Sequence, residues 1–171
     1  MPTDQASAGP PVLRLADTDQ EEVARLLSRF GLSLLRCADR QTIPGSYWGD
    51  DEAGLKGDRL YARADTPLHS ILHEACHYIC VSAERRRQLD TNAGSDEAEE
   101  NAVCYLQVLL AEQLAGMGRA RMFADMDAWG YSFRLGSSRG WFESDAGDAL
   151  AWLIEQQLID DNAQPLWRLR R

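Results

Sequence analysis

The stretch Pro67-Leu-His69-Ser-Ile-Leu-His73-Glu74-Ala-Cys-His77-Tyr78 holds all three histidines of this 171-residue chain, and part of it reads H-E-x-x-H. Thr66 is a good N-cap and Pro67 suits the first helical position, so the stretch predicts a helix. Residues at i and i+4 lie one above the other, so His73 and His77 present two imidazoles from one helix face. Neutral imidazole is the commonest metal ligand, so the pattern predicts a metal site.

The motif fixes only three positions, so chance matches in unrelated proteins are common. Here the same helix carries apolar residues that would bury it and hold the histidines rigidly: Ile71, Leu72, Ala75, Ile79 and Val81. His69 lies on the same helix, but two turns from His77, which is about 12 Å along the axis. We therefore expect His69 to neighbour the site and not to share its ion.

A metal ion that performs chemistry usually has three protein ligands and an open position for water. With no histidine left, the third ligand is expected to be a carboxylate or a thiolate. The next helix opens with Asp96-Glu97-Ala98-Glu99-Glu100 and so offers three glutamates. Cys76 and Cys80 share the helix face of the histidines, but a free cysteine is also a common small buried residue.

Composition favours one small domain and excludes several partners. The hydrophobic content of 44% is enough for a single core over residues 17–171, while the polar segment 1–16 is expected to be a flexible tail. The sequence has no apolar run of ~18 residues, so no membrane span is predicted. The net charge of −9 and the scattered basic residues exclude nucleic acid as a partner.

Four cysteines without disulfide-scaffold spacing, and no export signal, predict a cytoplasmic protein with reduced thiols. Nothing in the sequence predicts an oligomeric state.

Local patterns predict a compact α+β domain that is mostly helical and has a small β-sheet. Expected helices cover about 21–30, 67–81, 95–114, 122–129 and 145–159, and expected strands cover 32–37 and 59–63. Residues 131–141 are expected to be extended or irregular. The strand at 59–63 precedes the histidine helix, so we expect it to hold an extended peptide by edge pairing.

The motif and the following acidic helix resemble the gluzincins, metallopeptidases with two histidines from H-E-x-x-H and a glutamate from a later helix. Their glutamate commonly heads E-x-x-A, a pattern that Glu99-Glu100-Asn101-Ala102 fits. Glu99 also extends the apolar stripe of this helix by one turn, where a carboxylate must be paired or coordinated. The expected third ligand is therefore Glu99, with Glu100 as runner-up and Glu97 third.

This resemblance implies a zincin-like domain that holds zinc and hydrolyses peptide bonds in a peptide or protein substrate. Glu74 would be the catalytic general base that takes the proton of the water. The tetrahedral oxyanion then needs a donor, for which Tyr131 and, second, Arg134 are candidates by residue type.

About thirty residues also resemble the bacterial elongation factor P hydroxylases, which are thought to use iron on a fold like that of the peptidases. That family has H-E-x-x-H followed by an aromatic residue, a nearby cysteine and an arginine pair, and Tyr78, Cys80 and Arg85-Arg86 stand in similar places here. In that family the aromatic residue is Trp, and the position of the cysteine differs by one residue from that of the cysteine here. Two histidines and one carboxylate suit zinc or non-haem iron. A third alternative is a metal-stabilised binding domain without turnover.

Overall fold

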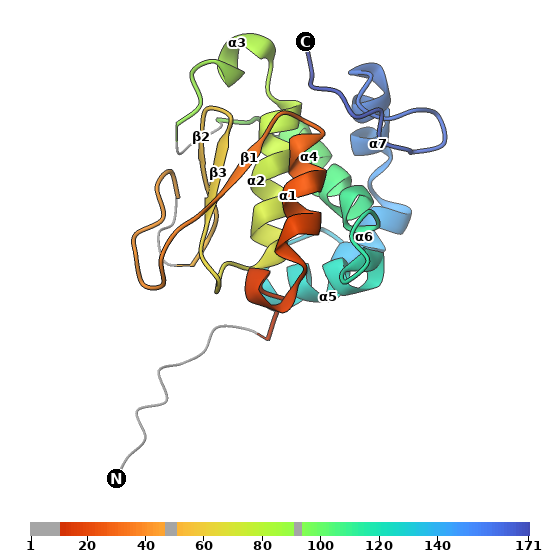
Figure 1. Cartoon of the computed structure of the whole chain (residues 1–171). Helices are drawn as coiled ribbons and strands as arrows, with labels where there is room; N and C mark the ends of the chain where they lie inside the picture. The colour runs from red at the N-terminus through yellow and green to blue at the C-terminus, as the bar shows by residue number, and fades with distance from the viewer. Residues whose placement is uncertain (1–10, 47–50, 91–93) are drawn as a thin grey trace.

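The computed structural model describes residues 11–46, 51–90 and 94–171, and these form a mostly helical α+β fold with a small sheet. In chain order the elements are η1 (Leu15–Asp17), α1 (Gln20–Ser28), β1 (Ser33–Arg36), β2 (Gly54–Lys56), β3 (Arg59–Ala62), α2 (Leu68–Cys80), α3 (Ala83–Arg86), α4 (Glu97–Ala111), α5 (Gly118–Trp129), α6 (Ser138–Ser144) and α7 (Gly147–Glu155). The sheet lies on one side of α2, and α4 to α7 gather on the other (Figure 1). The predicted fold class is confirmed.

The sheet has the strand order β1-β3-β2, with β1 parallel and β2 antiparallel to β3. Leu60 in β3 is paired with Leu34 on one side and with Leu55 on the other. Gly57 joins β2 to β3 with a φ of +58°, in the left-handed region that glycine tolerates best. Because β3 is paired along both edges, the prediction that the strand at 59–63 holds an extended peptide by edge pairing is wrong.

Helix α2 is buried between the sheet and α4, and its apolar side chains face both neighbours. It begins at Leu68 with Pro67 as the N-cap, one residue later than predicted. The hydroxyl of Thr66 does not cap the helix but accepts a hydrogen bond from the N–H of Arg63 at 2.8 Å. The helix of the H-E-x-x-H motif is therefore held by packing on both sides and not by a side-chain cap.

Two arginines close the C-terminal end of α2. The guanidinium of Arg86 donates to the carbonyls of Tyr78 and Val81 at 2.8 and 2.7 Å. The backbone N–H of Arg170 donates to the carbonyl of Ile79 at 3.0 Å, which attaches the C-terminal segment to the same helix end. Cations are favourable there because the last carbonyls of a helix lack backbone partners and carry partial negative charge.

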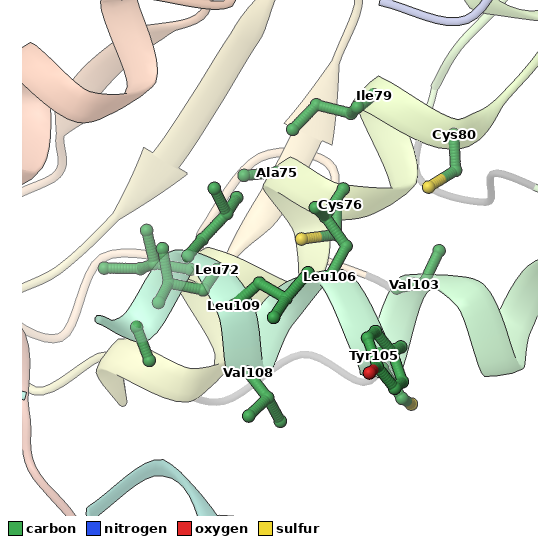
Figure 2. Close-up of a cluster of buried hydrophobic side chains, with 14 of the residues drawn as sticks. Leu72, Ala75, Cys76, Ile79, Cys80, Val103, Tyr105, Leu106, Val108 and Leu109 are labelled. Atoms are coloured by element: carbon green, nitrogen blue, oxygen red, sulfur yellow. The ribbon is translucent and has the colours of Figure 1, made fainter. Parts of the chain in front are cut away.

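Helix α4 packs along α2 and contributes many buried side chains to the core. Asp96 caps it, since its carboxylate accepts a hydrogen bond from the N–H of Glu99 at 2.8 Å. Figure 2 shows the apolar side chains that gather between the two helices, among them Leu72 and Cys76 from α2 and Val103 and Leu106 from α4. This packing fixes which face of α4 meets the histidine-bearing face of α2.

The N-terminal boundary differs from the prediction. Residues 1–10 lie outside the described residues, but the remainder of the expected tail packs on the domain. Leu15 is fully buried, the N–H of Leu13 donates to Asp125 at 2.9 Å, and Arg14 forms an antiparallel bridge with Pro67. The ordered domain therefore begins before residue 17.

None of the helices in the described parts of the chain is both long and apolar enough to cross a bilayer.

Candidate metal centre

Three side chains from α2 and α4 converge on one point. Nε2 of His73 lies 3.1 Å from Nε2 of His77. The carboxylate of Glu100 approaches both rings, with Oε1 at 3.1 Å from His73 Nε2 and Oε2 at 3.2 Å from His77 Nε2. Among the described residues, these three side chains each offer one potential ligand atom, and the three atoms lie within 4.8 Å of one another. The structure thus joins the two predicted histidines to the second-ranked glutamate.

The cluster is enclosed on the histidine side and open on the glutamate side. The side chains of His73 and His77 are 17% and 10% exposed, whereas that of Glu100 is 41% exposed. The hydroxyl of Ser95 donates to Glu100 Oε2 at 2.9 Å and helps to orient the carboxylate. A ligand entering from solvent would therefore reach the cluster beside Glu100.

Glu99, the expected third ligand, does not reach the histidines. Its side chain is 4% exposed and forms an ion pair with Arg85, whose Nη1 lies 2.7 Å from Oε2. Nη1 of Arg170 lies 3.8 Å from the same oxygen. A carboxylate in the apolar stripe must be paired, and the partners of Glu99 are guanidinium groups. Consecutive helical residues differ by about 100°, so Glu99 and Glu100 point to different neighbours.

Replacing Glu99 by Gln should therefore damage the fold and not the metal centre. We expect the free energy of unfolding of the metal-free protein to fall by about 2 kcal/mol, because hydrogen bonds to charged groups contribute about 1.5–3 kcal/mol. Urea denaturation would measure this loss. Glu97→Gln is the matched control and should be nearly silent, since Glu97 is exposed. Equal stability of the two variants would contradict the assigned role of Glu99.

The lower-ranked ligands are not brought to the cluster either. Glu97 is exposed and lines a separate hollow of about 340 Å³ with Asn101 and Asp148. The cysteines are free and buried, and burial raises the pKa values of Cys76 and Cys80. Neither sulfur belongs to the cluster of ligand atoms that lie within 4.8 Å of one another. The structure therefore does not support a thiolate ligand from α2.

Charges within the cluster stabilise each other. Burial opposes the charged form of Glu100, but hydrogen bonds from His73 and His77 hold its pKa well below its usual range. Burial likewise opposes a charged His73, yet Tyr131, Cys104 and Glu100 together raise its pKa well above the ordinary value. A cation between these side chains is therefore favoured by the whole arrangement.

Glu74 follows His73 on α2, about 100° around the helix. Burial raises its pKa, and the charges of Glu100 and Glu52 add to this, while His73 and His77 act in the opposite direction. All three members of the cluster are among the charges that act on Glu74. A carboxylate with a raised pKa is better matched to accepting a proton near neutral pH.

The buried His69 and the half-buried Tyr131 form a pair beside His73. Nδ1 of His69 lies 3.1 Å from the Tyr131 hydroxyl, and the rings of His73 and Tyr131 are 5.7 Å apart, edge to face. Burial, with smaller contributions from His73 and Arg14, lowers the pKa of His69 to about 3, so it is neutral at pH 7. Burial also raises the pKa of Tyr131 to about 12, so its hydroxyl keeps its proton. His69 thus neighbours the cluster as expected, and Tyr131 is close to it.

Arg134, the other candidate for stabilising an oxyanion, points elsewhere. Its side chain is 78% exposed, and its guanidinium forms an ion pair with Asp145. Asp145 precedes α7, and its pairing with Arg134 engages the guanidinium that an oxyanion would need. The interpretation of Arg134 as an oxyanion donor is not supported.

Sequence reasoning did not assign a role to Gln107, which contacts His73 directly. The side chain of Gln107 is fully buried, and its Oε1 lies 2.9 Å from His73 Nδ1. The sequence does contain a signal for this contact, because Gln107 follows Glu100 by seven residues and lies on nearly the same face of α4. A polar residue at that position in a buried helix indicates a partner on the facing helix.

In comparisons with protein-family models, curated proteins and solved structures, no match to this chain was found.

Proposed function

We propose that this protein is a metal-dependent hydrolase of peptide bonds, in which His73, His77 and Glu100 hold one divalent ion. Glu74 is the general base. The observation that carries the proposal is the convergence of two imidazole nitrogens and one carboxylate within hydrogen-bonding distance of each other. These donors fit zinc, which commonly takes three protein ligands in catalytic sites and leaves a fourth position open.

The chemistry of the three donors supports a cation at their centre. A carboxylate offers only acceptor oxygens, and an imidazole nitrogen without a proton offers a lone pair. Two ring nitrogens 3.1 Å apart, both facing a carboxylate, need a proton or a metal ion to bind them together. Because the cluster is open beside Glu100, a metal ion there would remain accessible to water and substrate.

A bound ion would polarise the scissile carbonyl and lower the pKa of a coordinated water. Glu74 would then act as the general base, taking a proton from the attacking water and passing it to the leaving amine. Its raised pKa assists the first step because the carboxylate is a stronger base than an exposed glutamate. Tyr131 lies beside His73 with its hydroxyl protonated, and we retain it as the candidate donor to the oxyanion.

The same ligand set also suits non-haem iron, so the metal itself distinguishes the two chemistries. The protein should be purified without added metal and its metal content measured by mass spectrometry. It should then be incubated with a mixture of unrelated peptides, with Glu74→Gln as the control for contaminating proteases. Near-stoichiometric zinc and cleavage that is lost in Glu74→Gln would support the peptidase. Stoichiometric iron without cleavage would contradict it and favour a hydroxylase. Zinc without cleavage would favour a binding domain.

A further inference from the structure

We propose that Gln107 is a positioning residue, which fixes the tautomer of His73 so that the Nε2 lone pair faces the cluster. This inference rests on the proposed metal centre. It concerns a residue of α4 that would not touch the metal ion or the substrate.

Gln107 is a polar side chain in an apolar environment. It is fully buried on α4, where its immediate neighbours Leu106 and Val108 are also buried. A buried amide without partners is costly, so both its donor and its acceptor must be satisfied. Its hydrogen bonds therefore determine its orientation.

The backbone of α2 sets the orientation of the amide. Nε2 of Gln107 lies 2.9 Å from the carbonyl oxygen of His69, which can only accept a hydrogen bond. It also lies 3.4 Å from the Tyr131 hydroxyl and 3.5 Å from the sulfur of Met122. The nitrogen of the amide must therefore face His69, and Oε1 must face His73 Nδ1.

This orientation determines where His73 carries its proton. Oε1 of Gln107 can only accept, so Nδ1 of His73, at 2.9 Å, must donate. In the neutral ring, Nε2 is then without a proton. That nitrogen is the one that lies 3.1 Å from both Glu100 and His77. A histidine that ligates through Nε2 needs this tautomer, and its partner at Nδ1 also fixes the direction of the ring.

The second histidine has no comparable support within the described residues. Nδ1 of His77 is buried without a hydrogen-bond partner there. The two imidazoles are thus held unequally: His73 by Gln107, and His77 by packing in α2. We therefore expect changes at Gln107 to act first on the protonation pattern of His73.

The experiment compares Gln107→Met, Gln107→Glu and Val108→Ala with the wild type. Met keeps an unbranched side chain but removes the acceptor, whereas Glu keeps an acceptor for Nδ1. Val108→Ala is the matched control, since it opens a cavity at the neighbouring buried position without removing a hydrogen bond. Long-range ¹H–¹⁵N spectra of metal-free, histidine-labelled protein, taken at alkaline pH where the rings are neutral, report each tautomer. Competition with a chelator reports zinc affinity.

In the wild type we expect the Nδ1–H form of His73. Gln107→Met should shift the His73 tautomer towards Nε2–H. It should also weaken zinc binding about 10–100-fold, which is the usual effect of removing the hydrogen-bond partner of a metal-ligating histidine. Gln107→Glu should keep the Nδ1–H form. Val108→Ala should lower the denaturation midpoint and leave tautomer and affinity unchanged.

Two outcomes would overturn the role of Gln107: an Nε2–H form of His73 in the wild type, or unchanged tautomer and affinity in Gln107→Met. If these occur while the wild type binds zinc tightly, the metal centre stands and only the role of Gln107 fails. If the wild type binds no metal but the tautomer depends on Gln107, the proposed function fails and the positioning role stands.

Discussion

Replacing His77 by Ala is expected to remove nearly all bound metal. His77 Nε2 faces both other members of the cluster, at 3.1 Å from His73 and 3.2 Å from Glu100. Two remaining ligands are too few to hold zinc tightly. We expect the affinity to fall by more than 100-fold, because losing a residue that merely supports a ligand already costs about 10–100-fold. Metal analysis of purified protein and chelator competition would measure the loss.

The same variant should also lose the stability that bound metal gives to the wild type. An ion that binds only the folded state stabilises it by about 2.7 kcal/mol when its free concentration is 100 times the dissociation constant. Chelator-treated wild type is the control, since it should show most of the same loss. Retention of full metal content by His77→Ala would end the metal-centre interpretation as a whole.

Glu100→Ala should weaken metal binding nearly as much as His77→Ala does. Glu99→Gln serves as the contrast, because its carboxylate faces Arg85 and should affect stability more than metal affinity. This ranking reverses the one expected from the sequence.

Much of the site could be predicted because it lies within one helix. His73, Glu74 and His77 depend only on the period of α2, and the apolar residues around them ensure that this helix is buried. A carboxylate from the next helix was also predictable, since that helix opens with three glutamates. Local information therefore identified two of the three side chains in the cluster and Glu74, the proposed base.

The choice between Glu99 and Glu100 depended on distant residues. Both belong to the first turn of α4, and a difference of about 100° decides which one faces α2. Glu99 is buried as expected, but its charge is balanced by Arg85 and by Arg170 at the C-terminus. Nothing in the local pattern of α4 shows that these guanidinium groups reach it.

The elements missed by the sequence reasoning are short. Strand β2 has three residues, lies in a Gly- and Asp-rich segment and is not among the predicted strands. Helix α6 occupies part of the segment expected to be irregular; Ser137 caps it by accepting a hydrogen bond from the N–H of Gly140. Glycine and serine within so short a segment resemble a loop, and tertiary packing overrides this preference.

Replacing Glu74 by Gln is expected to separate chemistry from metal binding. Gln has nearly the same shape but cannot take a proton from water. Turnover should therefore fall about 10²–10⁴-fold, which is the usual contribution of a general base. Zinc content should stay close to that of the wild type, because Glu74 is not a member of the three-residue cluster. Peptide cleavage and metal analysis on the same preparation would measure both.

Glu52→Gln is the matched control for this variant. Glu52 is another carboxylate whose charge reaches Glu74, and it accepts a hydrogen bond from Trp129 Nε1 at 3.0 Å, which an amide oxygen can also accept. If charge near the site were all that mattered, both variants would lose turnover to a similar degree. If Glu74 is the base, only Glu74→Gln should lose it. Loss of metal in Glu74→Gln would instead make Glu74 a ligand, and the proton would then need another acceptor.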